Sequence, residues 1–193
     1  MEENVNTKQY HRRSIRLKGF NYSSDGAYFV TICTQDREML FGDINNGKMV
    51  LNDIGKMVNY YWFQIPVKFP SIELGQSQIM PNHIHGIIFI CRGGPMCPPN
   101  ESGLTRRSTP TINPTLGTII QWFKTMTTNN YINNVKNLNW VPFDKRVWQR
   151  NYYEHIIRNE KDLNKISKYI LNNPLIWYRD RNNPQAKKDL TPY

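Results

Sequence analysis

Acidic residues are scarce in this chain. Its 193 residues include 15 Asp and Glu against 25 Lys and Arg, which gives a formal net charge of +10 and a pI of about 9.6. Such an excess of positive charge predicts a polyanionic partner. No amphipathic lysine-rich helix stands out, so nucleic acid is favoured over a membrane surface. The alternative is a basic protein whose charge has no specific partner.

Long apolar runs and paired cysteines are also missing. No apolar run approaches the roughly 18 residues that a membrane span needs. The first residues lack the basic start and apolar stretch of a signal peptide. The three cysteines (Cys33, Cys91 and Cys97) show no metal-ligand spacing and leave an odd thiol. We therefore expect reduced thiols in a cytoplasmic protein without membrane contact.

The periodicity of apolar residues predicts an α+β domain. Strands are expected at 27–34, 71–79, 84–90 and, as a short edge strand, 147–150, and helices at 51–65, from Thr115 onward and at 162–173. Strands and helices in this order are typical of a ferredoxin-like antiparallel sheet with helices on one face.

The composition along the chain predicts one domain with two extensions. Residues 1–26 form a basic N-terminal arm, residues 27–178 a single domain, and residues 179–193 a C-terminal tail. Glycine and proline crowd residues 92–113, which indicates a long flexible loop inside the domain.

Two histidines stand out on the third predicted strand. His83 and His85 are two residues apart, so both imidazoles emerge on one face of the strand and Ile84 on the other. Two neutral imidazoles side by side can chelate a divalent cation, which can serve phosphate chemistry. The alternative is a hydrogen-bonded polar pair at a sheet edge.

The last predicted helix carries two polar side chains next to its apolar stripe. Leu163, Ile166 and Ile170 form the stripe, with Tyr169 and Asn173 four residues apart along its edge. Pro174 is expected to end the helix and to push Asn173 out of regular helical geometry. If the stripe packs on the histidine face of the strand, the Asn173 oxygen joins the two imidazoles as a third metal ligand, and the Tyr169 hydroxyl points into the site. Otherwise Tyr169 is a tyrosine at the rim of the core and Asn173 a helix cap.

Together these elements resemble the single-tyrosine transposases of the HUH superfamily. That family carries His-hydrophobe-His on a central strand and, on a later helix, a tyrosine followed four residues on by an amide metal ligand. The similarity is greatest to the REP-associated tyrosine transposases, in the blocks 28–37, 80–86 and 148–160. The amide is an asparagine here, as in that branch, where the insertion-sequence branch has glutamine.

The resemblance implies a complete reaction. Mg²⁺ or Mn²⁺ bound by His83, His85 and Asn173 would polarise a phosphodiester of single-stranded DNA, and Tyr169 would attack it to give a 5′-phosphotyrosine and a free 3′-hydroxyl. Rejoining needs no nucleotide cofactor, because the covalent bond conserves the energy of the broken linkage. The implied partner is single-stranded DNA with a hairpin like a REP palindrome, in the bacterial cytoplasm at the nucleoid. The chain would act as a monomer or a homodimer.

The basic residues are expected to bind this DNA. The set comprises Arg12, Arg13, Arg16, Lys18, Lys124, Arg150, Arg158, Lys165 and Lys168. His155 is an auxiliary candidate, for which a structural or phosphate-contacting role is favoured over that of a base. Two other classes of protein remain. One is a catalytically silent module that binds hairpins or single strands; the other is a zinc hydrolase barrel, for which 193 residues are few.

Overall fold

The computed structural model describes residues 25–91 and 114–186. Almost all of the predicted N-terminal arm, the predicted loop at 92–113 and the last seven residues lie outside the described residues.

A four-stranded antiparallel sheet forms the centre of the fold. Its strands are β1 (Gly26–Cys33), β4 (Ile72–Met80), β5 (His83–Ile90) and β6 (Tyr153–Ile157). They lie in the order β4-β5-β1-β6, so β1 and β5 are the inner strands and β6 is an edge. This confirms the predicted α+β class and the antiparallel sheet.

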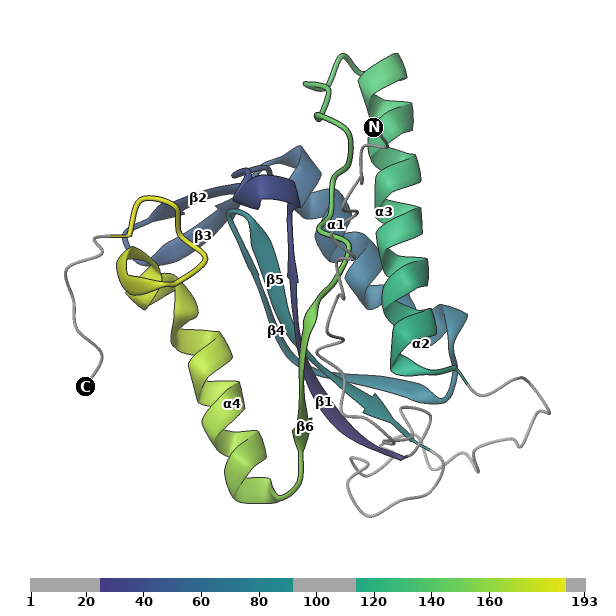
Figure 1. Cartoon of the computed structure of the whole chain (residues 1–193), viewed down its shortest axis with the longest axis vertical. Coiled ribbons are helices and arrows are strands. Elements are labelled where there is room, and N and C mark those ends of the chain that lie inside the picture. The colour runs from purple at the N-terminus through teal and green to yellow at the C-terminus, as the bar shows by residue number, and fades with distance from the viewer. Residues whose placement is uncertain (1–24, 92–113, 187–193) are drawn as a thin grey trace, which may run out of the picture.

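Helices cover both faces of the sheet rather than one, which corrects the prediction (Figure 1). On one face lie α1 (Asp53–Phe63), the short α2 (Ile65–Lys68) and α3 (Leu116–Asn137), and on the other lies α4 (Glu160–Asn172). Short 3-10 helices, η1 (Gln35–Arg37) and η2 (Asn173–Arg179), follow β1 and α4.

The alternation of side chains along β1 explains why both faces are covered. Tyr28, Val30 and Ile32 belong to the larger core under α1 and α3. Ala27 and Phe29 point the other way and pack with Ile170 of α4. Burial of apolar area on both faces stabilises the sheet, at roughly 25 cal/mol per Å² removed from water. The predicted apolar stripe of α4 (Leu163, Ile166 and Ile170) therefore packs against the sheet, as expected from the sequence.

A small hairpin precedes α1 and was not predicted. It joins β2 (Gly42–Asn45) to β3 (Lys48–Leu51). Asn46 and Gly47 form its two-residue turn, with φ of 49° and 71°. Two consecutive positive φ angles mark a type I′ turn, for which Asn-Gly is the preferred sequence.

The predicted edge strand at 147–150 was wrong, and the edge strand is β6 instead. β1 ends at Cys33, and the segment before β6 pairs with the chain at that point through one isolated bridge, Thr34 with Trp148, in which Gln149 N–H donates to Cys33 O and Gln35 N–H to Val147 O. The Trp148 side chain is buried and its indole N–H donates to Thr127 Oγ1 at 2.9 Å. Side-chain anchoring thus holds this segment as an irregular connection.

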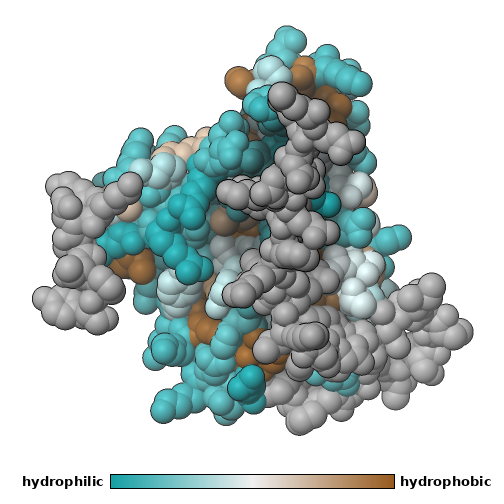
Figure 2. Space-filling model, in the orientation of Figure 1, coloured by the Kyte–Doolittle hydropathy of each residue, from teal (hydrophilic) through white to brown (hydrophobic). Residues whose placement is uncertain are grey.

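Hydrophilic side chains cover most of the described surface in Figure 2, with smaller hydrophobic patches between them. Among the described residues, no helix has the length and apolar character needed to cross a membrane.

Candidate metal and tyrosine site

The two histidines lie in the middle of the sheet, not at its edge. β5 runs between β4 and β1, and both imidazoles emerge on the face that α4 covers. His83 is 0% and His85 2% exposed. Ile84 points to the other face and belongs to the larger core. The pair therefore does not lie at a sheet edge, while the hydrogen-bonded polar pair of the alternative interpretation is present.

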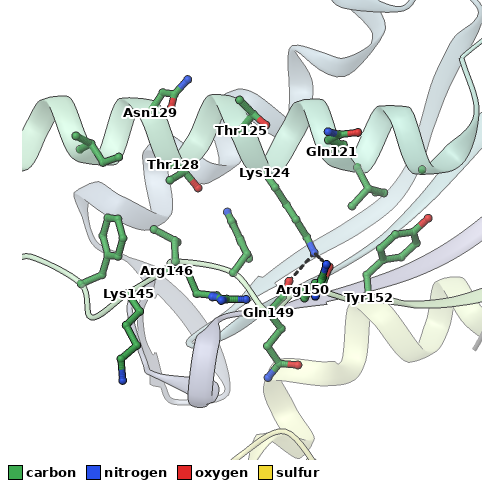
Figure 3. Close-up of a pocket in the computed structure, with 16 residues that line it drawn as sticks. Gln121, Lys124, Thr125, Thr128, Asn129, Lys145, Arg146, Gln149, Arg150 and Tyr152 are labelled. Atoms are coloured by element: carbon green, nitrogen blue, oxygen red, sulfur yellow. Dashed lines mark hydrogen bonds between the residues drawn. The ribbon is translucent and has the colours of Figure 1, made fainter. Parts of the chain in front are cut away.

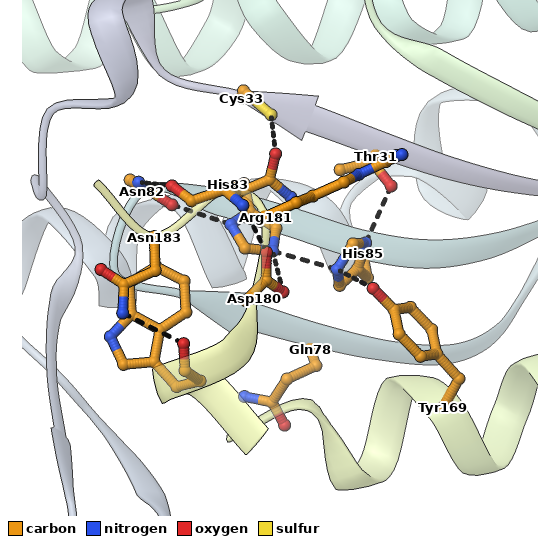
Figure 4. A network of polar contacts seen from close by, with 12 residues as sticks. Thr31, Cys33, Gln78, Asn82, His83, His85, Tyr169, Asp180, Arg181 and Asn183 are labelled. Carbon is orange, nitrogen blue, oxygen red and sulfur yellow. Dashed lines mark hydrogen bonds and ion pairs between the residues drawn. The ribbon is translucent and has the colours of Figure 1, made fainter. Parts of the chain in front are cut away.

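Hydrogen bonds fix how the two rings are turned. His83 Nδ1 lies 2.8 Å from Asn82 Oδ1, and His85 Nδ1 lies 2.8 Å from Thr31 Oγ1. An amide oxygen only accepts, so the His83 Nδ1–H donates and leaves a lone pair on Nε2. The two Nε2 atoms face each other at 3.0 Å (Figure 4).

Electrostatics keeps both rings neutral. Burial lowers the pKa of His83 to about 3, and the charges of Arg37 and Arg181 act in the same direction. Burial, followed by the neighbouring His83, also holds the pKa of His85 well below its ordinary value. A neutral imidazole is the form that binds a metal.

The third group of the predicted site is Tyr169 on α4. Its hydroxyl oxygen lies 3.4 Å from His85 Nε2 (Figure 4). Its ring packs edge-on against Phe29, and the side chain is 40% exposed. Burial, then the charge of Asp180, raises the pKa of the phenol. The structure thus brings the tyrosine to the histidine pair of its own chain, with a hydroxyl that keeps its proton at neutral pH.

Asn173 is buried one turn after Tyr169, but its backbone differs from the prediction. With φ −57° and ψ −42° it keeps helical geometry, and the chain continues into η2 rather than turning away. Pro174 is tolerated because it stands at the start of η2. Neither side-chain atom of Asn173 makes a hydrogen bond of standard length within the described residues, although the amide lies near enough to Tyr169 to lower its pKa. A buried amide without a bond of standard length among the described residues is unusual, and this fits a metal-binding role for the Asn173 oxygen.

A fourth group comes from the segment predicted as a C-terminal tail. Asp180, just after η2, is 7% exposed, and its Oδ2 lies 3.9 Å from His83 Nε2. The backbone N–H of Asn182 donates to the other carboxylate oxygen at 2.6 Å, and Asn82 Nδ2 donates to Asn182 O at 2.8 Å. The boundary predicted at residue 178 therefore separates residues that the fold keeps together. The run 180–184 consists of turn-forming residues apart from Arg181, and such a composition gives no sequence signal for burial.

The side chains around the histidine pair fit a hard divalent cation. One ligand atom from each of His83, His85 and Asp180 lies within 4.8 Å of the others. Imidazole with carboxylate and amide oxygen suits Mg²⁺ or Mn²⁺. The two Nε2 atoms lie 3.0 Å apart, the length of a hydrogen bond between the rings.

The other predicted site residues are dispersed. Arg12, Arg13, Arg16 and Lys18 lie outside the described residues. Arg158, Lys165 and Lys168 are exposed around α4, while Lys124 and Arg150 line a groove under α3, on the opposite face of the sheet. His155 Nε2 bonds with Asp162 Oδ2 at 3.0 Å, which ties β6 to α4. This contact fits a structural role for His155, which is one of the two roles, structural or phosphate-contacting, that the sequence favours.

Comparison with known proteins places these observations in a family. No protein-family model matches the chain. An uncharacterized protein of Haemophilus influenzae is 44% identical over 183 residues, 94% of this chain and 98% of that protein. A second H. influenzae protein, whose name assigns it provisionally to the REP-associated tyrosine transposases, is 27% identical over 80% of this chain and 73% of its own length.

A solved structure shares the fold of this chain. The structure of a REP-associated tyrosine transposase bound to a REP hairpin has a TM-score of 0.50 and 18% identity, and the match covers 83% of this chain and 73% of that one. This chain therefore belongs to one family with the uncharacterized H. influenzae protein; it is similar in sequence to the provisionally named REP-associated tyrosine transposase, and it has the fold of the REP-associated tyrosine transposase solved with a REP hairpin.

Proposed function

We propose that this protein is a metal-dependent enzyme that nicks and rejoins single-stranded DNA beside hairpins through a covalent 5′-phosphotyrosine. One observation carries the proposal: the Tyr169 hydroxyl lies 3.4 Å from an imidazole nitrogen that faces a second imidazole at 3.0 Å. A nucleophile and two metal ligands thus converge at one point of the fold.

The proposed ligands are His83, His85 and Asp180, with Asn173 as a further oxygen donor. Asp180 extends the ligand set expected from sequence, and it adds the negative charge that favours a hard cation. When bound, Mg²⁺ or Mn²⁺ would polarise a phosphate oxygen and stabilise the charge of the transition state. Arg37 and Arg181 add positive charge near the same point, as their effect on the pKa of His83 indicates.

Tyr169 supplies the nucleophile. Its hydroxyl oxygen forms a bond to phosphorus while the bond to the 3′ oxygen breaks, so the phenol gives up its proton and the leaving oxygen becomes a 3′-hydroxyl. Because the raised pKa of Tyr169 disfavours the phenolate, positive charge at the site has to stabilise it. The phosphotyrosine retains the energy of the linkage, so rejoining requires no nucleotide cofactor.

The substrate follows from charge and similarity. The formal net charge of +10 favours a nucleic acid, and a protein of the same fold was solved with a REP hairpin. We therefore propose single-stranded DNA carrying such a hairpin, which places the protein in the bacterial cytoplasm.

Incubation with labelled hairpin oligonucleotides and Mn²⁺ or Mg²⁺, followed by denaturing electrophoresis, tests the proposal. We expect a covalent adduct that is lost with chelator and in Tyr169→Phe. Tyr178→Phe is the matched control, because Tyr178 is another exposed tyrosine a few residues away. An adduct that persists in Tyr169→Phe would exclude this nucleophile. Binding without any adduct would instead favour the catalytically silent module.

A further inference from the structure

A groove lies on the sheet face opposite the histidine site. It has a volume of about 600 Å³ and runs between α3 and the segment 143–152 (Figure 3). α3 and Trp148 share the core that holds Val30 of β1, whereas α4 packs with Phe29 on the other face. We call this cavity the α3 groove; the Tyr169 site does not use it.

The side chains that line the α3 groove suit a ligand that carries negative charge and hydrogen-bonding groups. Its basic side chains are Lys124, Lys145, Arg146 and Arg150, and its amides and hydroxyls are Gln121, Asn129, Gln149, Thr125 and Thr128. Phe143 and Tyr152 add aromatic rings. None of the described residues that line it is acidic, although Asp144 pairs with Lys145 just outside at 3.5 Å.

Lys124 shapes the wall of the groove rather than reaching for a ligand. Its ammonium donates to the carbonyls of Gln149 and Arg150 at 2.8 and 3.4 Å (Figure 3) and to that of Asn151 at 3.2 Å. These three bonds hold the segment that carries the exposed Arg150 against α3. Arg150 therefore presents its positive charge to the groove from a backbone that hydrogen bonds hold in place.

Size decides what form of nucleic acid this groove can take. A volume of about 600 Å³ is that of a site for a small ligand. A double helix, whose major groove alone is about 12 Å wide, cannot enter it. One or two unpaired nucleotides can, with phosphates on the arginines, base edges on the amides and a base against an aromatic ring.

The edge strand β6 connects the groove with the tyrosine site. Tyr152 lines the groove, and the next residue, Tyr153, points to the other face of the sheet. There its ring lies 6.1 Å from that of Phe29 and under Arg181, whose guanidinium carbon is 5.5 Å from the ring centre. Because no strand of the described sheet lies beyond β6, a DNA strand held at one site has only to cross this edge to reach the other.

We infer that the α3 groove binds unpaired nucleotides of the same DNA strand that is cut at Tyr169. This inference rests on the proposed function for its substrate, and it adds a second binding point that fixes which unpaired nucleotides flank the cut. The hairpin stem is not the occupant.

Binding is measured on a Tyr169→Phe background, so that it does not depend on nicking. Fluorescence anisotropy compares a hairpin carrying a single-stranded extension with the same hairpin without one. We expect Arg146→Gln with Arg150→Gln to weaken binding of the extended hairpin about 10-fold and to lower its salt dependence by about 0.7 for each phosphate that is no longer neutralised. Binding of the blunt hairpin should be unchanged. Lys136→Gln is the matched control, since Lys136 is exposed on α3 but does not line the groove.

A cross-link locates the nucleotides independently of affinity. An extension that carries 5-iodouracil is irradiated on the protein, and the adducted peptide is identified by mass spectrometry. Attachment at Tyr152 or Phe143 supports the inference. Equal loss of binding for blunt and extended hairpins in the double variant, or cross-links confined to the α4 face, would overturn it. Absence of the Tyr169 adduct in the wild-type protein would refute nicking alone and leave these binding results intact.

Discussion

Gly86, directly after the second histidine, has no room for a side chain. A Cβ built on it would lie 2.2 Å from Cζ2 and 2.6 Å from Cη2 of Trp62. Trp62 belongs to α1 and is fully buried in the larger core. Gly86→Ala therefore forces either the indole or β5 itself to move, and a movement of β5 displaces His85.

The expected cost follows from overpacking. One extra carbon in a full core costs about 1–3 kcal/mol, and because both clashing atoms belong to a buried ring the upper half of that range applies. Trp62→Phe removes those two atoms. The indole N–H has no hydrogen-bond partner among the described residues, so this truncation costs packing only. In the double variant the new methyl group fills part of the space that the truncation leaves.

Urea unfolding of the two single variants and the double variant measures the coupling. We expect the double variant to be more stable than the sum of the single effects predicts by about 1 kcal/mol or more. Titration with Mn²⁺ should show weaker binding in Gly86→Ala and partial recovery in the double variant. Additive stabilities would refute the steric argument, because they would mean that the methyl group and the indole do not compete for the same space.

Three further changes test the site and its surroundings. Asp180→Asn should weaken Mn²⁺ binding in calorimetry by at least about 10-fold while the unfolding midpoint changes little, and equal affinity would exclude Asp180 as a ligand. Thr31→Val removes the partner of His85 Nδ1 and should lower Mn²⁺ affinity by about 10- to 100-fold, which Thr31→Ser should restore. Burial lowers the pKa of Lys124 to about 8 from 10.5, so between these values the unfolded chain binds more protons at this group, and the contribution of Lys124 to stability should rise with pH, by up to about 3 kcal/mol. Denaturant unfolding at pH 7 to 10 should show this rise in the wild type and not in Lys124→Met.

The site groups predicted from sequence lie on regular elements. A strand repeats every two residues and a helix every 3.6, so His83 with His85 and Tyr169 with Asn173 could be placed on common faces from their spacing alone. The stripe of Leu163, Ile166 and Ile170 then identified which face of α4 meets the sheet.

The residues that were not predicted lie in irregular segments, where side chains do not repeat with the period of a strand or a helix. Asp180 reaches the site through a turn held by hydrogen bonds to Asn82 and Asn182, and such bonds leave no pattern in a sequence. The edge strand was misplaced for a related reason. Val147 and Trp148 are apolar, which predicts a buried strand, and both are indeed buried. Side-chain packing under α3 and one isolated bridge hold them, not a ladder of backbone hydrogen bonds.

Asn82, in the turn between β4 and β5, joins the parts of the site that come from distant segments. Its side-chain oxygen accepts a hydrogen bond from His83 Nδ1–H at 2.8 Å, while its Nδ2 donates to the carbonyls of Arg37 and Asn182 at 3.0 and 2.8 Å. Its own carbonyl accepts from the backbone N–H and hydroxyl of Thr34. Only a primary amide can accept toward the imidazole and donate twice toward carbonyls at once. The same side chain therefore sets the tautomer of His83 and the position of the segment that carries Asp180, so the imidazole and the carboxylate are oriented toward one point by a single residue.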